Sequence, residues 1–324
     1  MMKTLSRETL RIDCASEIER IRSAIREQVT KILRRRGAAI GLSGGIDSTL
    51  VAALCVQALG KDRVFGILMP EKESSPESTE LGRLAVESLG IRYIVEDITP
   101  ILEGARCYER RDEAIRKCIP EYAAGYRAKI VLPGIMEDER LRVFSVVVQA
   151  PDGRVIKIRM PADVYLAVIA ASNFKQRTRK MMEYHHADRL NYAVAGTPNR
   201  LEYELGFFVK NGDGAADLKP LAHLYKTQVY QLAEYIGVPV EILSRPSTTD
   251  TYSLPQSQEE FYFSLPLERL DLCLFAFNHG MQPTDIAASV DLTPEQVERV
   301  YRDIESKHRA AHYGHLAPLL VESI

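Results

Sequence analysis

The sequence predicts an α/β fold: a Rossmann-like, doubly wound parallel sheet with an antiparallel β insertion and a helical C-terminal part. Short apolar runs alternate with helical segments through residues 16–98, which is typical of βαβ units whose strands are covered on both faces. Residues 128–161 break this alternation with strand-like runs, and residues 257–324 carry mainly helical patterns. We expect residues 1–324 to form a single domain.

The first expected element is an amphipathic helix over residues 16–36, which Gly37 should end in the usual C-terminal position. Its apolar side chains recur at helical spacing among charged ones: Ile18, Ile21, Ile25, Val29 and Leu33. Buried strands are then expected at residues 38–42, 64–69, 91–98 and 192–195. The helices expected between these strands cover residues 49–59, 76–89 and 164–189.

Three strand-like runs make up the expected insertion, at residues 129–132, 141–149 and 154–160. Asp152-Gly153 lies between the last two, and Asp-Gly between two β-rich runs is a good hairpin signal. Beyond the sheet, we expect a helix over residues 222–236, ended by Gly237. A loop rich in proline, serine and threonine follows at residues 245–258.

Bulk composition excludes several classes of function. The 324 residues include 42 basic and 44 acidic side chains, so a net charge of −2 favours neither nucleic acid nor an anionic membrane as a partner. No apolar run approaches the roughly 18 residues of a membrane span, and the N-terminus lacks the apolar core of a signal peptide. Five scattered cysteines form no CxxC pair and indicate a reducing, cytoplasmic location.

A glycine-rich turn follows the first expected strand and opens the next helix: Gly41-Leu42-Ser43-Gly44-Gly45-Ile46-Asp47-Ser48. Glycines let the backbone approach an anion closely, and the free N–H groups of a helix start point towards it. Asp47 cannot favour a phosphate directly, so we expect it to hold Mg²⁺ against one. The turn contains neither Gly-Lys-Ser/Thr nor GxGxxG, which excludes the Walker loop and the dinucleotide fingerprint. The alternative is an ordinary strand-to-helix turn.

Further blocks of polar and glycine residues follow in a fixed order along the chain. They are Asn173-Phe174-Lys175-Gln176-Arg177-Thr178-Arg179, Gly196-Thr197-Pro198-Asn199-Arg200-Leu201-Glu202, Gly206 to Asp217, Leu224-Tyr225-Lys226-Thr227-Gln228, and Arg245-Pro246-Ser247-Thr248. The turn at residues 41–48 resembles the signature of the N-type ATP pyrophosphatases, which share the adenine nucleotide alpha hydrolase fold. The ordered blocks together resemble the NAD synthetase family, of the ammonia-dependent type, over roughly residues 15–105 and 165–310.

This resemblance implies an enzyme that activates the nicotinate carboxylate of deamido-NAD as an acyl-adenylate and releases pyrophosphate. Ammonia then displaces AMP and gives NAD. ATP is a co-substrate in this scheme, Mg²⁺ is the cofactor, and a homodimer is expected. Because the chain has no glutaminase domain, we expect ammonia to be free or delivered by a separate glutaminase.

The resemblance also implies roles for individual residues. It indicates Asp47, Lys226 and Asp213 for catalysis, and Asp47 and Glu202 for the metal. The residues implied in ATP binding are the turn from Gly41 to Ser48 with Thr197, Lys226, Ser247 and Thr248. The residues implied in deamido-NAD binding are Asn173, Arg177, Lys210, Asp217, His308 and Arg309.

The chemistry of these side chains agrees with those roles, but each has a plainer alternative. Carboxylates suit an oxygen-ligated Mg²⁺ that bridges phosphates, and lysine or arginine suits the phosphates themselves. Taken singly, Glu202 and Lys226 could be solvated helix residues, and Arg177 part of an exposed helix face. Asp213 and Asp217 could be ordinary turn residues.

Two alternatives stay open, and three departures from the family pattern give rise to the first. The compact family members lack an insertion such as residues 128–161. The block Arg245 to Thr248, which resembles the family's second phosphate loop, continues here as Thr249-Asp250-Thr251-Tyr252. The family's His-Lys-Arg occurs only as Lys307-His308-Arg309. A related amide ligase that acts on another carboxylate is therefore the first alternative. The second is a helix-turn-helix DNA-binding protein, because residues 283–309 scan like that motif. The acids of its second helix argue against DNA.

Overall fold

The computed structural model describes residues 5–132, 144–249, 251–263 and 265–322. Its central element is a four-stranded sheet in the order β3-β2-β1-β7, with every neighbouring pair parallel. The strands are β1 (Ala38–Gly41), β2 (Val64–Leu68), β3 (Arg92–Val95) and β7 (Ala193–Val194). The predicted α/β class with a parallel sheet is confirmed.

Both faces of this sheet are covered by helices. Successive side chains of a strand point to opposite faces, so neighbouring residues pack in different clusters. Ile40 and Leu68 lie in one apolar cluster and Ala39 and Ile67 in another. The first cluster packs under α1 (Cys14–Glu27), α2 (Ile46–Leu59), α3 (Pro76–Leu89) and α8 (Lys226–Ile236). The second packs under α4 (Thr99–Gly104), α5 (Cys107–Arg116) and α6 (Ala162–Leu190). The sheet is doubly wound, as predicted.

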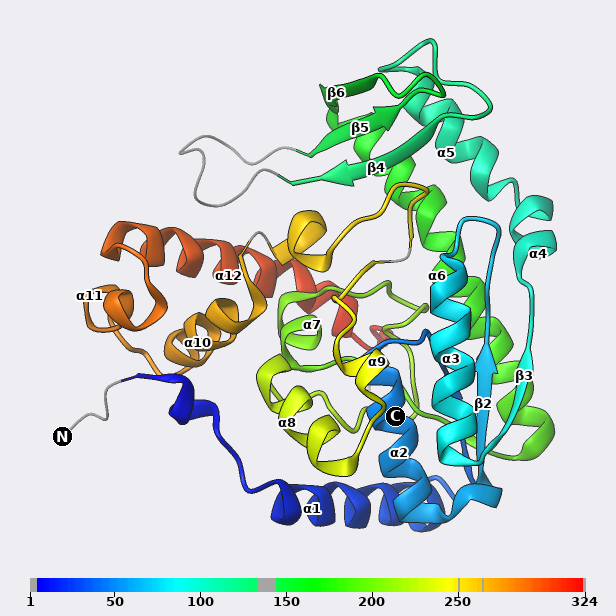
Figure 1. Ribbon diagram of the computed structural model, residues 1–324, viewed down its shortest axis with the longest axis vertical. Coiled ribbons are helices and arrows are strands. Elements are labelled where there is room, and N and C mark those ends of the chain that lie inside the picture. Colours follow the sequence, from blue (N-terminus) through cyan, green and yellow to red (C-terminus); the bar gives the residue numbers. More distant parts are fainter. Residues whose placement is uncertain (1–4, 133–143, 250, 264, 323–324) are drawn as a thin grey trace.

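The predicted antiparallel insertion is present as a separate three-stranded sheet. Its strands are β4 (Arg127–Val131), β5 (Ser145–Gln149) and β6 (Val155–Arg159), and both neighbouring pairs are antiparallel. Residues 133–143, which include the start of the strand expected at 141–149, lie outside the described residues. This small sheet lies at the top of Figure 1, beside α5 and one end of the long helix α6.

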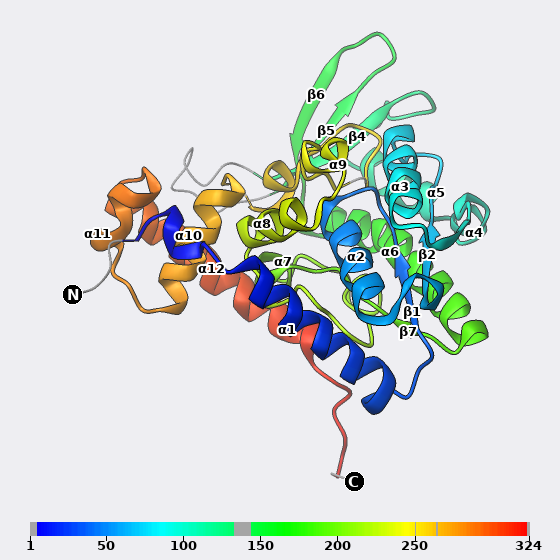
Figure 2. The same cartoon turned by 60° about the horizontal axis from the view of Figure 1, so that its bottom comes forward.

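The C-terminal part is helical, as expected, and has an apolar core of its own. It contains α10 (Leu267–Asn278), α11 (Pro283–Ile286) and α12 (Pro294–His315), which pack with α7 (Arg200–Leu205) and with Leu5 and Leu10 near the N-terminus (Figures 1 and 2). The segment that scans like a helix-turn-helix buries Ile286, Val290 and Val297 in this core. A packing role accounts for its apolar pattern. Among the described residues, no helix combines the length and hydropathy that crossing a membrane requires.

The first helix ends earlier than predicted, so the expected role of Gly37 is wrong. Helix α1 passes into one π turn, Gln28–Ile32, and Arg34 then takes the left-handed conformation, with φ of 53°. Gly37 lies just before β1, where a Cβ atom would clash with the carbonyl oxygen of Arg63 and the ring of Tyr192. It is therefore required for the close approach of three chain segments, and it caps no helix.

Candidate active site

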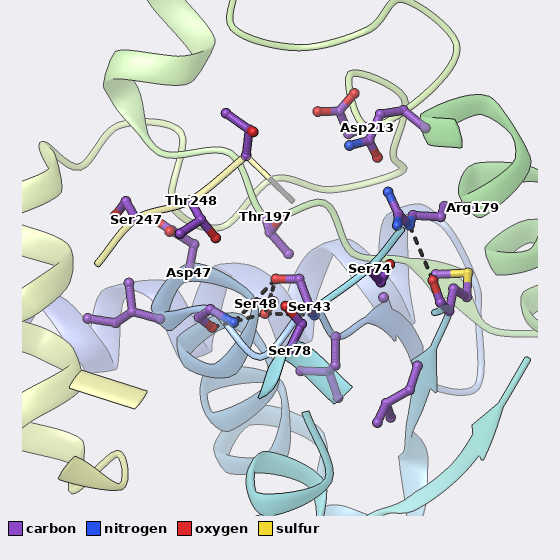
Figure 3. Close-up of a pocket in the computed structure, with 18 of the residues that line it drawn as sticks. Ser43, Asp47, Ser48, Ser74, Ser78, Arg179, Thr197, Asp213, Ser247 and Thr248 are labelled. Atoms are coloured by element: carbon purple, nitrogen blue, oxygen red, sulfur yellow. Dashed lines mark hydrogen bonds between the residues drawn. The ribbon is translucent and has the colours of Figure 1, made fainter. Parts of the chain in front are cut away.

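The glycine-rich turn connects β1 to α2 at the carboxyl edge of the parallel sheet. Gly44 has a φ of 74°, and a Cβ atom there would clash with the carbonyl oxygen of Ser78 at the start of α3. Ser48 donates from Oγ to the carbonyl oxygen of Gly45 over 3.0 Å, and its Oγ lies 3.3 Å from Ser43 Oγ. These bonds hold the two hydroxyl groups together in the middle of the pocket (Figure 3).

A second loop closes one side of this pocket. Figure 3 shows Ser247 and Thr248 on one side of Ser48. Arg245, at the start of this loop, donates to Ser78 Oγ over 2.6 Å and to the carbonyl oxygen of Ser43 over 3.4 Å. Arg245 therefore ties the second loop to the glycine-rich turn.

The opposite side of the pocket is formed by α6 and by the loop that follows α7. Figure 3 shows Arg179 and Asp213 on this side. Arg179 donates from Nε to the carbonyl oxygen of Met69 over 3.4 Å, so its guanidinium group is held at the end of β2. Of the residues predicted for ATP, those lining this pocket are Gly41, Leu42, Ser43, Gly45, Ile46, Asp47, Ser48, Thr197, Ser247 and Thr248.

Asp47 and Glu202 line the pocket, whereas Lys226 does not line it and lies buried beside Asp47. Asp47 Oδ2 accepts a hydrogen bond from the buried Nζ of Lys226. Burial lowers the pKa of Lys226, but the charges of Asp47 and Glu202 outweigh this and raise it. Burial, followed by the charge of Asp47, raises the pKa of Glu202. The lysine is therefore cationic and binds Asp47, while the two carboxylates repel each other.

Asn199, to which the sequence assigned no role of its own, connects the two carboxylates. Its Nδ2 donates to Asp47 Oδ1 and its backbone N–H to Glu202 Oε2, each over 3.1 Å. Its Oδ1 accepts from the N–H of Glu202 over 3.2 Å, which completes a capping box at the start of α7. The spacing Asn-x-x-Glu before an apolar run is the signal that could have identified it.

The carboxylates of Asp47 and Glu202 fit an Mg²⁺ ion that is also bound by phosphate oxygens. Within the described residues there is no group of three or more histidine, cysteine, aspartate or glutamate side chains that could hold a metal. Asp47 and Glu202 nevertheless both face the pocket and repel each other. Mg²⁺ is commonly bound by one or two carboxylates, with phosphate oxygens and water completing its octahedron. The two carboxylates suit a metal that arrives with a nucleotide.

Asp213 is held by its own loop. Its Oδ1 accepts from the N–H of Val209 over 2.8 Å, and burial raises the pKa of its carboxyl group. This loop begins at the end of α7 and passes in front of α6, where Gly212 packs directly on Gln176. The pocket therefore has an acid on the side away from the second loop (Figure 3).

The residues predicted for deamido-NAD do not line this pocket. Arg177 donates to the carbonyl oxygen of Lys210 over 3.3 Å. Lys210 donates from Nζ to the carbonyl oxygens of Tyr313 and Leu316, over 2.9 and 3.3 Å. Asp217 accepts from the N–H of Val194 over 2.8 Å. Arg177 and Lys210 are therefore connected to each other and to the end of α12, whereas Asp217 holds β7.

The other three residues of that predicted set are also separate from the pocket. His308 lies 3.6 Å from Glu204, and Arg309 lies 3.6 Å from Glu305 on the same helix. Asn173 lies on α6, about one turn before Arg177. The structure thus brings the predicted ATP and metal residues together, and places the predicted dinucleotide residues outside that pocket.

Comparison with known proteins places the chain in a family. Residues 17–121 and 155–312 match the family described as NAD synthase. The chain belongs to this family. The unmatched stretch between the two segments contains β4 and β5 of the insertion, whereas β6 lies within the second matched segment.

Individual relatives of this NAD synthase family member agree over almost the whole chain. A Rhizobium rhizogenes protein named NH3-dependent NAD(+) synthetase is 56% identical over 320 residues, which are 99% of this chain and 96% of the relative. A Thermotoga neapolitana protein of the same name is 36% identical and covers 89% of this chain and 91% of its own. The solved NMN synthetase from Francisella tularensis superposes with a TM-score of 0.64 over 96% of this chain and 99% of its own. At 22% identity it shows the fold alone.

In this NAD synthase family member, a buried ionic cluster contacts two of the segments that line the pocket, α6 and the second loop. Lys175, 1% exposed, donates from Nζ to Glu71 over 2.8 Å, to Glu73 over 2.7 Å and to the carbonyl oxygen of Thr251 over 2.7 Å. Arg111 pairs with Glu73 over 2.5 Å. Burial raises the pKa of Glu73, but Arg111 and Lys175 outweigh it and lower the pKa. The cluster joins α5 and α6 to the loop after β2 and to the second loop.

Proposed function

We propose that the protein converts deamido-NAD to NAD in an ATP-dependent amidation that releases AMP and pyrophosphate, with ammonia as the nitrogen donor. One observation carries the proposal: the glycine-rich turn, the second loop and Asp47 line one pocket, and Lys226 pairs with Asp47. Relatives named NH3-dependent NAD(+) synthetases, 54–56% identical over nearly the full length, support the choice of acceptor.

The proposed reaction has two steps. A carboxylate oxygen of the nicotinate ring attacks the α-phosphorus of ATP, and the bond from that phosphorus to pyrophosphate breaks. Ammonia then attacks the acyl carbon of the adenylate, loses a proton, and displaces AMP. Neither step needs a nucleophile from the protein, so positioning and neutralisation of charge carry the catalysis.

In this proposal the pocket residues bind and orient ATP. Ser43, Ser48 and the N–H groups at the start of α2 hold phosphate oxygens, and Ser247 and Thr248 approach the same phosphates from the second loop. Lys226, held by Asp47, supplies positive charge where pyrophosphate leaves. Mg²⁺, held by Asp47 and Glu202, would neutralise negative charge on the phosphates.

Four further parts of the proposal concern partners and location. The dinucleotide binds near Asn173, Arg177, Lys210, Asp217, His308 and Arg309. The protein acts as a homodimer, with ammonia either free or supplied by a separate glutaminase. A cytoplasmic location is supported by the five free cysteines.

The decisive experiment measures the products of ATP turnover. With Mg²⁺, ammonium and deamido-NAD, we expect AMP and pyrophosphate in equal amounts and no turnover when the acceptor is omitted. ADP and phosphate in their place would rule out the pyrophosphatase chemistry. The same assay with other carboxylates, including the mononucleotide half of deamido-NAD, tests the acceptor. A faster reaction with one of them would replace deamido-NAD and leave the ligase chemistry standing.

A further inference from the structure

A second hollow lies at the opposite edge of the parallel sheet, and arginine side chains line it. They are Arg34, Arg35, Arg36, Arg63, Arg92 and Arg189. Arg92 is the first residue of β3, and the others belong to the segments that lead into β1, β2 and β7. The end of α1 and the starts of β2 and β3 lie together at the lower right of Figure 1. The ATP pocket is at the carboxyl ends of the same strands.

Neutral acceptors orient several of these guanidinium groups. Arg63 donates to the carbonyl oxygen of Arg36 over 2.5 Å, and Arg92 to that of Asp62 over 3.1 Å. Arg35 donates to Asn191 Oδ1 over 2.7 Å. Within the described residues, none of the six arginines forms an ion pair. Each guanidinium has five N–H donors, so most of the donors are left for a ligand.

The fold does not explain this concentration of charge. Six guanidinium groups share the hollow with one carboxylate, that of Asp62, although the whole chain has a net charge of −2. Like charges at close range destabilise the folded state unless a counter-charge is present. Neutral side chains would make the same hydrogen bonds to carbonyl oxygens without that cost. The missing counter-charge is therefore expected to come from outside the chain.

We infer that this hollow is a second anion site, which binds a small molecule with two or more linked phosphates. Arginine binds phosphate oxygens through two parallel N–H bonds, and several arginines around one hollow match a chain of phosphates. A nucleic acid surface would need an extended basic stripe and exposed aromatic rings for stacking. Here the arginines surround one hollow, and its aromatic side chain, Tyr192, is only 9% exposed.

The test uses the full chain and tripolyphosphate, in the presence of a chelator and at low salt, with binding measured by calorimetry. Arg34 and Arg36 are the residues to change, because both side chains are exposed and, among the described residues, neither side chain makes a hydrogen bond that supports the fold. The double variant Arg34→Gln with Arg36→Gln should bind tripolyphosphate about tenfold or more weakly, since it loses two charged contacts. Its release of AMP should stay unchanged, because the hollow lies away from the ATP pocket.

A matched control removes the same charge elsewhere. Arg106→Gln with Arg110→Gln, on an exposed part of the chain where Arg106 is paired with Glu109, should leave tripolyphosphate affinity unchanged. The inference is overturned if wild type does not bind tripolyphosphate, or if both double variants bind it as tightly as wild type. In the Arg34/Arg36 variant, the affinity of the hollow for ATP should fall in parallel with its affinity for tripolyphosphate. That result would show that the phosphate chain is the recognised part. Preferential binding of a single-stranded oligonucleotide, lost in the Arg34/Arg36 variant, would overturn it in favour of a nucleic acid surface.

Discussion

Asp47 is the residue on which the charge balance of the ATP pocket depends. Its two carboxylate oxygens are already engaged, one by Lys226 and one by Asn199. Glu202 is held differently, by the backbone of Asn199 and by Gln258 over 3.2 Å. Loss of Asp47 therefore removes the partner of a buried lysine, whereas a change at Glu202 leaves that ion pair intact. The two acids should respond differently to substitution.

Glu202→Gln and Asp47→Asn should each lower turnover by about 100-fold or more at saturating substrates, because each removes a charged ligand that faces pyrophosphate. Glutamine also completes a capping box, so Glu202→Gln should keep the melting temperature of wild type. Asp47→Asn should lower it, because an unpaired buried charge costs about 3–5 kcal/mol. AMP release and thermal unfolding measure the two effects. Wild-type turnover of either variant at saturating Mg²⁺ would remove that residue from the site.

The dinucleotide residues give a prediction that separates the two substrates. Arg177→Ala and Lys210→Ala should each lower kcat/KM for deamido-NAD by a factor worth about 2 kcal/mol, as expected for one charged hydrogen bond. Lys226→Ala should instead weaken the binding of ATP. Initial rates with each substrate varied in turn measure both constants. Arg179→Ala is the matched control, because Arg179 lines the ATP pocket from the same helix. If all four variants changed the KM for ATP equally, the assignment of separate residues to ATP and to deamido-NAD would be refuted.

At this scale the sequence identified residues that belong to a continuous local motif, and their roles stay predictions. Residues 41–48 and the second loop line the same pocket in the structure. Each could be identified because it is continuous in the chain. Lys175 was not predicted, since its acceptors Glu71, Glu73 and Thr251 are 76 to 104 residues away. A buried lysine is indistinguishable in sequence from an exposed one on the same helix.

Among the elements, α6 is the one that connects the pocket to the rest of the molecule. Gln176, Arg179 and Glu183 face the pocket from it, and Lys175 faces the cluster behind. Through Lys175, α6 holds the carbonyl oxygen of Thr251, three residues beyond Thr248. The position of the second loop therefore depends on a side chain that does not line the pocket.

Lys175→Met should raise the KM for ATP several-fold with a smaller change in kcat, because the second loop loses its anchor. It should also lower stability by about 3–5 kcal/mol, since Glu71 and Glu73 lose a buried partner. Leu102→Ala, on the buried face of α4, is the control for stability, at a cost of about 2–5 kcal/mol. Both variants are assayed well below their melting temperatures. If Lys175→Met changes the KM for ATP no more than Leu102→Ala does, the cluster has no positioning role.

Element boundaries were harder to predict than element types. The helix expected over residues 222–236 begins at Lys226, because Asp271 of α10 accepts from the N–H groups of Lys226 and Thr227, over 3.2 and 2.7 Å. Burial raises the pKa of Asp271 to about 6, and these N–H donors oppose the shift. Gln228 contributes a local bond, accepting from the N–H of Tyr225 over 3.0 Å, but the part of the cap that comes from 45 positions away leaves no signal in the nearby sequence. The short helices α4, α5 and α7 were not predicted.

For the whole molecule, the fold class followed from the alternation of apolar runs and helices, which is a property of the entire chain. The assignment of all residues to one domain stays a prediction. Two pockets lie at opposite edges of the parallel sheet, the one proposed for ATP at the carboxyl ends and the arginine hollow at the amino ends. The sequence could not place the second, because its arginines come from four separate segments that only the sheet brings together.

The expected homodimer is tested best on the outer face of α6. Leu166 and Met181 are 62% and 52% exposed there, an unusual exposure for large apolar side chains. With 3.6 residues per turn, Leu166, Arg177 and Met181 lie within about 60° of one another around the helix. If this face meets a second copy, Arg177 lies at the interface. That position would explain why a residue predicted to bind the dinucleotide lies outside the ATP pocket.

Sedimentation velocity at micromolar concentration should therefore show a dimer. Leu166→Glu with Met181→Glu should convert it to a monomer, because a symmetric interface places each new charge near its own copy. The monomer should have a raised KM for deamido-NAD, since Arg177 would lose the partner surface, while ATP affinity stays close to wild type. Tyr235→Glu, at a side chain 61% exposed on α8, is the control and should remain dimeric. A wild-type monomer with full activity would refute both the interface and its part in binding the dinucleotide.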